Sequence, residues 1–112
     1  MSDCLFCKIA AGDIPTDYLY EDDRVVVFRD IYPKADTHLL VVPREHIASL
    51  NELEPQHEAL MGHMIGLLPK LAEQEGLESG FRTIINTGRG GGQEIFHIHI
   101  HLMGGPKLPG FQ

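Results

Sequence analysis

Two different hydrophobic periods run along this chain of 112 residues. Most of it alternates apolar and polar residues with a period of two, or carries short apolar runs, which is typical of β-strands. These patterns predict five strands, over residues 17–21, 24–29, 37–42, 81–86 and 95–103. Short turns join the strands, as at Asp22-Asp23, so we expect an antiparallel sheet and a fold of the α+β class.

A helical period of three to four residues dominates the stretch 55–75, which begins with Pro55 and stops at Gly76. Its apolar stripe predicts one long helix that lies against the sheet. The stripe comprises Leu60, Met61, Met64, Ile65, Leu68, Leu71 and Ala72. His57 and His63 fall off this stripe, so we expect them at the surface. A second, short helix is predicted over residues 5–10, with Asp3 as its N-cap.

The last predicted strand holds three histidines, His97, His99 and His101, which alternate with aliphatic residues. Side chains alternate between the faces of a strand, so the three imidazoles would share one face at spacings of about 6.5 Å. Imidazole is the side chain whose unperturbed pKa lies near neutral pH. The row is therefore a candidate either for zinc ligation or for metal-free nucleophilic catalysis, and the spacing does not separate the two.

A glycine-rich segment, Gly88-Arg89-Gly90-Gly91-Gly92, runs directly into the histidine row. Glycine permits positive φ angles and lets the backbone approach a ligand closely, and successive N–H groups in such a loop can form an anion site. The alternative interpretation is a flexible connection between strands that needs no ligand. Next to three aligned imidazoles, we favour a phosphate cradle.

Acidic residues outnumber basic ones by 16 to 9, which gives a formal net charge of −7. General binding to nucleic acids or to anionic membranes needs a basic surface, so neither is expected. No apolar run reaches the roughly 20 residues that span a membrane, and no signal peptide opens the chain. We expect a cytoplasmic protein with a single domain over residues 1–112.

The two cysteines, Cys4 and Cys7, form a C-x-x-C pair. In a reducing compartment such a pair is typical of a metal clip or of a redox centre. A thioredoxin-like redox centre needs a preceding strand, and only three residues precede Cys4. Zinc would need two more ligands, for which His46 and one of the three aligned histidines are candidates.

The motif His97-Ile-His99-Ile-His101-Leu-Met103 resembles the signature of the histidine triad (HIT) family. Gly92-Gln93-Glu94 before it and Gly104-Gly105 after it resemble the Hint branch, whose members are purine nucleoside phosphoramidases. Further segments along nearly the whole chain are similar to that branch. They are Ile14-Pro15, residues 20–23, residues 28–31, Thr37-His38, Val42-Pro43 and residues 85–88.

The resemblance implies a five-stranded antiparallel sheet that dimerises into a ten-stranded one. It also implies hydrolysis of the P–N bond in purine nucleoside 5′-phosphoramidates, without a cofactor in the chemistry. His99 would be the nucleophile that forms a nucleotidyl-histidine. His101 would contact the phosphate and assist proton transfer, and His38 would support the site.

Binding roles carry over from the family in the same way. The Gln93 side chain and the loop N–H groups around Gly91 and Gly92 would donate to the phosphate. Asn86 would lie near ribose and phosphate, and Asp30 would accept from the ribose hydroxyls. An apolar slot for the purine would be framed by Phe6, Phe28, Leu5, Ile9 and Ile31, for which ordinary core packing is the alternative.

Some family members bind a structural zinc, and their ligands match Cys4, Cys7, His46 and His97. Three other functions stay open at this point. A related branch hydrolyses dinucleoside polyphosphates, but it usually follows the triad with Pro-Arg where this chain has Gly104-Gly105. A non-catalytic purine-nucleotide binder would keep the fold without needing His99. A zinc-dependent hydrolase would lose its activity on chelation.

Overall fold

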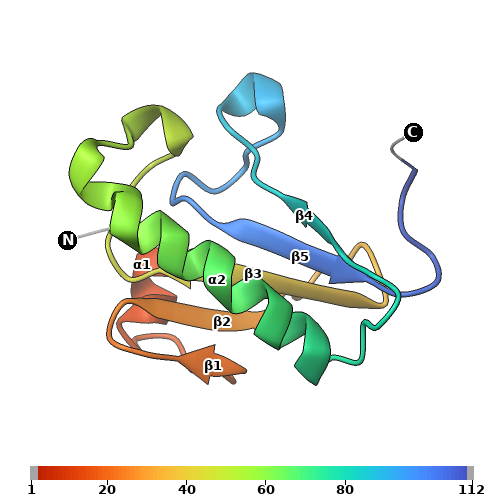
Figure 1. The fold of residues 1–112 in the computed structure, drawn as a ribbon. Helices are drawn as coiled ribbons and strands as arrows, with labels where there is room; N and C mark the ends of the chain where they lie inside the picture. The colour runs from red at the N-terminus through yellow and green to blue at the C-terminus, as the bar shows by residue number, and fades with distance from the viewer. Residues whose placement is uncertain (1–2, 111–112) are drawn as a thin grey trace.

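A computed structural model describes residues 3–110, so the two residues at each end of the expected 1–112 domain lie outside it. Five strands form one antiparallel sheet in the order β1-β2-β3-β5-β4 (Figure 1). The strands are β1 Tyr20–Glu21, β2 Val25–Arg29, β3 Thr37–Pro43, β4 Arg82–Ile84 and β5 Ile100–Gly104. This sheet and its long helix confirm the predicted α+β fold.

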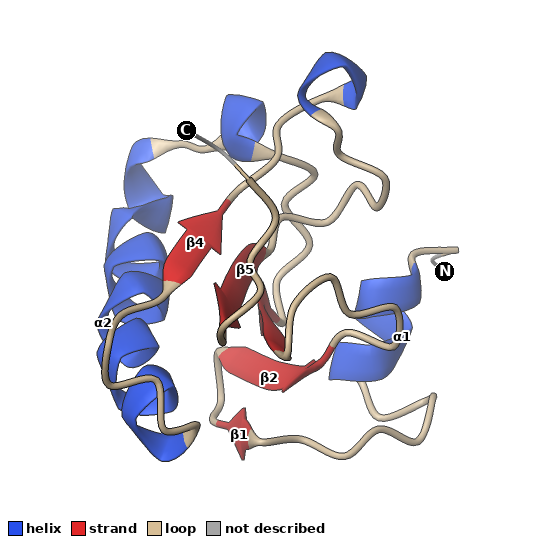
Figure 2. Ribbon diagram, turned by 90° about the vertical axis from the view of Figure 1, so that its right-hand side faces the viewer, coloured by secondary structure: helices blue, strands red, loops and turns tan. Residues whose placement is uncertain are grey.

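Two helices cover opposite faces of the sheet (Figure 2). The long helix α2, Glu58–Gln74, buries Met64 and Leu71 against one face, and the short helix α1, Leu5–Ala10, buries Phe6 against the other. Three short 3₁₀ helices complete the structure: η1 Leu50–Glu52, η2 Pro55–His57 and η3 Arg89–Gly91. Among residues 3–110, no helix has both the length and the apolar content needed to cross a bilayer.

The predicted alternation around the histidines is confirmed. Ile98, Ile100 and Leu102 are fully buried in the core beneath α2. The ring of His99 instead lies edge-on to Phe6 of α1, on the opposite face. One period-two pattern therefore supplies both the core and the candidate site.

The expected strand over residues 95–103 is wrong in its bounds, because β5 begins only at Ile100. The β3–β5 ladder ends at the pair Val41 and Ile100. Beyond it, Pro43 has no N–H to donate to a longer ladder, and its carbonyl accepts from His97 Nε2 at 2.7 Å. His97 and His99 therefore precede the strand, and only His101 lies within it.

Several helix details also differ from the prediction. The N-cap of α1 is Cys4, whose Sγ accepts from the Cys7 N–H, and not Asp3. The expected helix over residues 55–75 is divided into η2 and α2. On α2, Ile65 is 49% exposed, so it faces away from the sheet.

His57 is buried and not at the surface as expected. Its Nδ1 accepts from the Glu54 N–H at 3.0 Å, which caps the start of the helix, and its Nε2 lies 3.2 Å from Glu45 Oε2. His63 is partly exposed and lies 2.6 Å from Asp22 Oδ2, joining α2 to the β1–β2 turn. A histidine that caps a helix or contacts a carboxylate can be buried without belonging to the apolar stripe of that helix.

Candidate functional site

His99 has a tautomer that the main chain selects. Its Nδ1 lies 2.7 Å from the carbonyl oxygen of His97, so Nδ1–H donates and Nε2 keeps its lone pair. The ring is buried, and burial lowers the pKa of His99 from its ordinary value, opposed in part by the bond to His97 and by Asp30. A neutral imidazole with one free ring nitrogen is the form that acts as a nucleophile.

His38 and His101 form a second pair whose tautomers are also determined. The backbone N–H of Lys34 donates to His38 Nδ1 at 3.0 Å, so the proton of neutral His38 is on Nε2. His38 Nε2 lies 2.9 Å from His101 Nδ1 and donates to it. His101 must then carry its proton on Nε2, which leaves that N–H available as a donor.

Burial keeps both of these rings neutral. It lowers the pKa of His101 to about 4, with further lowering by His99 and His38. It also lowers the pKa of His38, although the nearby carboxylate of Asp30 acts in the opposite direction. Asp30 Oδ2 lies 3.5 Å from His38 Nε2, and its Oδ1 accepts from the Tyr32 N–H at 2.9 Å. The ring centroids of His99 and His101 are 5.0 Å apart, so the free Nε2 of His99 and the Nε2–H of His101 belong to one site.

The residues expected to frame a purine divide into two groups. Phe6, Phe28 and Ile9 are buried in the core between α1 and the sheet. Leu5 and Ile31 are 44% and 81% exposed. The first group therefore contributes to core packing, while the second has surface that a ligand can cover.

The glycine-rich loop directs its hydrogen bonds inward. The N–H groups of Gly91 and Gly92 donate to the carbonyls of Gly88 and Arg89, within η3. Asn86 Nδ2 donates to the Gly91 carbonyl at 2.8 Å. Gly88 and Gly92 have φ angles of +74° and +88°, which favour glycine. This inward pattern differs from the arrangement expected of preorganised phosphate donors.

Gln93 is a buried brace for this loop. Its Nε2 donates to the carbonyls of Ala48 and Ile95 at 2.7 and 3.0 Å, and its Oε1 accepts from the Gly88 N–H at 2.8 Å. Both N–H bonds of the amide are thus used inside the protein. The structure does not bring this amide into the site as the free donor that the family resemblance implied.

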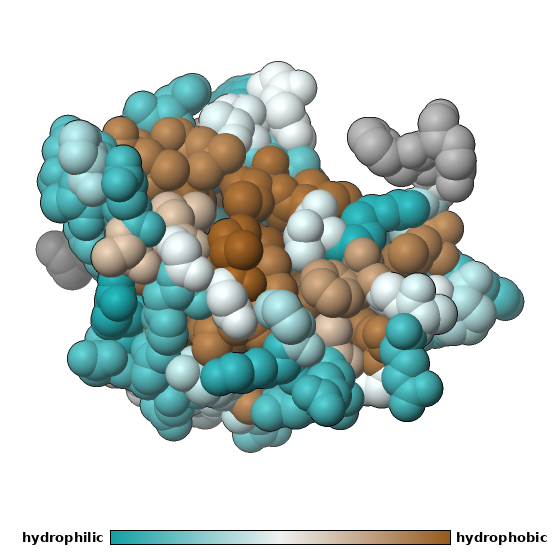
Figure 3. Space-filling view, in the orientation of Figure 1, coloured by the Kyte–Doolittle hydropathy of each residue, from teal (hydrophilic) through white to brown (hydrophobic). Residues whose placement is uncertain are grey.

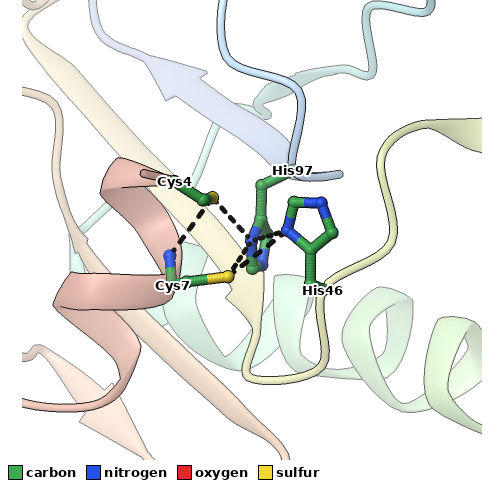
Figure 4. Close-up of side chains that lie close together, drawn as sticks. All are labelled: Cys4, Cys7, His46 and His97. Atoms are coloured by element: carbon green, nitrogen blue, oxygen red, sulfur yellow. Dashed lines mark hydrogen bonds between the residues drawn. The ribbon is translucent and has the colours of Figure 1, made fainter. Parts of the chain in front are cut away.

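The cysteine–histidine set meets at one point, where α1, the loop after β3 and the segment before β5 converge (Figure 4). The candidate ligand atoms of Cys4, Cys7, His46 and His97 all lie within 4.8 Å of one another. Cys4 Sγ and Cys7 Sγ are 3.3 and 3.5 Å from His97 Nδ1. Cys7 Sγ and His97 Nδ1 are each 3.3 Å from His46 Nδ1.

These separations fit a tetrahedral zinc site. With bonds of about 2.3 Å to sulfur and about 2.0 Å to nitrogen, a tetrahedron places two nitrogens about 3.3 Å apart and sulfur and nitrogen about 3.5 Å apart. His97 also donates its Nε2–H to the Pro43 carbonyl, so its Nδ1 presents a lone pair. Such a bond from the second ring nitrogen is typical of histidines that ligate metals.

Sequence reasoning missed the main-chain groups that orient the imidazoles. These are the carbonyls of His97 and Pro43 and the N–H of Lys34. Backbone groups are the same in every residue, so no residue pattern could have identified them. His97, the first histidine of the row, was expected as a metal ligand but not as the acceptor that orients His99.

The fold and the site together define the class: an α+β protein with neutral, oriented imidazoles along one face of an antiparallel sheet. The family model described as "Scavenger mRNA decapping enzyme C-term binding" matches residues 3–111. Protein HitA of Neisseria gonorrhoeae is 52% identical over 106 residues, 95% of this chain and 99% of that protein. The purine nucleoside phosphoramidase of Escherichia coli K12 is 50% identical over 105 residues, 93% of this chain and 88% of that protein.

Solved structures agree. The HIT family hydrolase from Legionella pneumophila is 47% identical, with a TM-score of 0.91 over 94% of this chain and 95% of that chain. A histidine triad protein from Clostridium difficile is 43% identical, with a TM-score of 0.93 over 100% of this chain and 98% of that chain. The chain belongs to the histidine triad (HIT) family, as its sequence predicts, and it is a hydrolase.

Proposed function

We propose that this hydrolase cleaves the P–N bond of purine nucleoside 5′-phosphoramidates through a covalent nucleotidyl-histidine at His99. The observation that carries the proposal is the 2.7 Å bond between His99 Nδ1 and the His97 carbonyl, which leaves Nε2 as the attacking atom. The name of the Escherichia coli relative, a purine nucleoside phosphoramidase, supports the same activity.

In the first step the lone pair of His99 Nε2 forms a bond to the α-phosphorus. The P–N bond to the leaving group breaks, and its electron pair goes to the amine nitrogen, which takes up a proton from solvent. Negative charge grows on the non-bridging oxygens, and the His101 Nε2–H is the donor that the His38 chain aims at them. In the second step water attacks phosphorus, its proton is released, and His99 leaves with its lone pair restored.

The nucleotide is placed by groups around the imidazoles. Asp30 is the acceptor for the ribose hydroxyls, and its side chain lies beside His38. Leu5 and Ile31 supply exposed apolar surface for the base. A purine fits this assignment because its flat apolar faces cover such surface while the diol meets the carboxylate.

Cleavage of dinucleoside polyphosphates is the competing activity within the family. The other branch carries Pro-Arg after the triad, whereas a Cβ at Gly104 would lie 2.6 Å from Leu77 Cδ1. Gly105 has a φ of +115°, and a Cβ there would lie 2.7 Å from Asp36 Cβ. Larger side chains at these two positions would crowd Leu77 and Asp36, so the surroundings in this chain suit Gly104-Gly105, the pair that resembles the phosphoramidase branch.

The test uses adenosine 5′-phosphoramidate and diadenosine tetraphosphate as alternative substrates, with wild type and His99→Ala. We expect wild type to hydrolyse the phosphoramidate at least about 100-fold faster, and His99→Ala to lose turnover while still binding AMP. Mass spectrometry of the acid-quenched reaction should detect a nucleotidyl adduct in wild type alone. Turnover by His99→Ala at the wild-type rate would refute the mechanism, and faster cleavage of the tetraphosphate would refute the substrate.

A structural zinc is part of the proposal. Cys4, Cys7, His46 and His97 would hold it, and four protein ligands leave no open position for substrate. When bound, zinc would act as a cross-link that joins α1 to the segment before β5. The imidazoles of His99 and His101 are outside this set, so hydrolysis needs no metal ligand. Metal analysis after purification without chelator should find about one zinc per chain, and less than half an equivalent would count against the site.

We also propose that two chains pair through the face shared by α2 and β4. Within residues 3–110 the edge strand β4 has a neighbour on one side only, β5, so pairing with a second β4 would extend the sheet to ten strands. Apolar atoms gather on the face where α2 and β4 lie in Figure 1 (Figure 3). Ile65 and Phe81 are 49% and 39% exposed.

Light scattering should give twice the chain mass for wild type and for Lys8→Gln, which makes the same charge change of −1 on the opposite face. Ile65→Glu should shift the population towards the mass of one chain. A wild-type mass of one chain at micromolar concentration would refute the proposed dimer.

A further inference from the structure

His97 contacts both the cysteine–histidine cluster and His99. Its ring lies in the cysteine–histidine cluster, with Nδ1 3.3 Å from Cys4 Sγ and 3.5 Å from Cys7 Sγ. Its main-chain carbonyl is the acceptor 2.7 Å from His99 Nδ1. A bond that fixes the His97 ring therefore restrains the position of the carbonyl that orients His99, because the ring and the carbonyl are attached to the same α-carbon.

A second connection runs through α1. Phe6 lies in the first turn of this helix, between Cys4 and Cys7. Its ring is edge-on to the ring of His99, with 5.0 Å between centroids, and to the ring of His97 at 6.0 Å. The helix that carries both thiols therefore also supplies the wall against which the nucleophile rests.

The segment between the cluster and His99 is held by contacts other than the hydrogen-bond ladder of β5. Residues 97–99 lie outside the β5 ladder, which begins at Ile100. Ile98 N–H donates to the Ile47 carbonyl at 2.6 Å, and His97 Nε2 donates to the Pro43 carbonyl. Both acceptors, Pro43 and Ile47, flank the loop that carries His46. A metal ion bound by His46 and His97 would therefore restrain this loop together with residues 97–99.

We propose, on the basis of the phosphoramidase function above, that a metal ion on Cys4, Cys7, His46 and His97 positions the nucleophile as well as the fold. His97 and Phe6 are positioning residues for His99: the first acts through its carbonyl and the second through its ring. Without the ion, hydrogen bonds of 3.3–3.5 Å between these side chains stand in place of metal–ligand bonds, and they restrain the segment less firmly.

We expect metal removal to lower kcat and to leave the affinity for AMP almost unchanged. A displacement of about 1 Å in a reacting group can lower the rate about 100-fold. The phosphate and ribose contacts assigned to His101 and Asp30 come from β5 and from the end of β2, outside this segment. Metal removal should therefore lower kcat about 10- to 100-fold while the AMP dissociation constant changes less than about threefold.

The experiment compares the full chain as purified, after chelation, and after reconstitution with Zn²⁺, with circular dichroism to confirm that each form is folded. Long-range ¹H–¹⁵N spectra of the imidazoles report the His99 tautomer without any turnover, and His99→Gln assigns its signals. We expect one Nδ1–H tautomer with zinc, a mixture of tautomers after chelation, and restoration of both tautomer and kcat by Zn²⁺.

Cys4→Ser is the second perturbation, because it removes a ligand while keeping the helix cap. Cys4 Sγ accepts from the Cys7 N–H as the N-cap of α1, and serine is a preferred N-cap. This variant should reproduce the kcat and the spectrum of chelated wild type and should not respond to Zn²⁺. His63→Leu is the control for a general loss of stability, since it removes the bond from α2 to Asp22 on the other face of the sheet. It should keep the wild-type tautomer and the response to Zn²⁺.

The outcomes separate this inference from the proposed function. Equal kcat and an unchanged His99 spectrum in the zinc and chelated forms would overturn the positioning role while phosphoramidase activity stands. A tautomer that responds to zinc in a chain that never hydrolyses phosphoramidates would support the coupling and refute the function. Failure of chelated protein to take up Zn²⁺, with no change in spectrum, would overturn the inference as well.

Discussion

Replacement of Gln93 by leucine separates two roles for this side chain. As a phosphate ligand it would contribute to nucleotide affinity, whereas as a brace it contributes to the stability of the glycine-rich loop. The structure supports the brace, because the buried amide makes three hydrogen bonds, to Ala48, Ile95 and Gly88. Leucine is close in size but can make none of them.

The size of the effect follows from those bonds. Each typical hydrogen bond contributes about 1 kcal/mol net, and a buried partner left without one adds a further penalty. Three bonds therefore correspond to a loss of about 2–4 kcal/mol in the free energy of unfolding. For a domain of this size, that corresponds to a fall of about 10–20 °C in melting temperature.

Urea unfolding and thermal unfolding measure the change, and AMP titration measures affinity in the same samples. Gln56→Leu is the matched control, since Gln56 is exposed and its side chain bonds to the exposed Glu54 Oε1, so its effect should stay within about 0.5 kcal/mol. Gln93→Glu should destabilise at least as much as Gln93→Leu, because its carboxylate would face the two carbonyls of Ala48 and Ile95. A Gln93→Leu protein with wild-type stability and a tenfold loss of AMP affinity would refute the reasoning.

Three further outcomes are expected. His38→Leu removes the donor that fixes the tautomer of His101, so kcat should fall about 100-fold in steady-state assays, with KM changed less than the rate. A histidine in the unfolded chain takes up its proton as the pH falls below about 6.5, whereas folded His101 does so near its pKa of about 4. Between these two pH values the unfolded state therefore binds more protons than the folded state. Stability is therefore complete above pH 6.5 and should fall by about 3 kcal/mol towards pH 4 in urea titrations of chelated protein; a flat profile would contradict the assignment. Gly105→Ala should cost about 1–3 kcal/mol because its Cβ would meet Asp36 Cβ at 2.7 Å, whereas Gly90→Ala, with nothing within 4 Å, should be nearly neutral.

Much of the architecture could be predicted because it depends on local periodicity. Alternation placed Ile98, Ile100 and Leu102 in the core and the neighbouring imidazoles on the other face, as the structure confirms. Strand ends were less predictable. The β5 ladder starts at Ile100 because its partner strand ends in Pro43, a residue far away in the sequence.

The histidines illustrate the same division. His57 was expected at the surface, but it is buried as a helix cap beside Glu45, a contact that helical periodicity does not report. The C-x-x-C pair indicated a metal clip from local spacing. Only folding brings His46 and His97, separated by 51 residues, to 3.3 Å from each other.

The sequence by itself determined the class of fold, the family and the residue types available for chemistry, because these depend on patterns that neighbouring positions carry. Tertiary structure decided which nitrogen of each imidazole holds its proton, and whether Gln93 meets a ligand or the loop. Those choices rest on main-chain carbonyls and N–H groups brought close by folding, such as the His97 carbonyl at 2.7 Å from His99 Nδ1. Backbone groups are identical at every position, so no sequence pattern can encode which of them a side chain will meet.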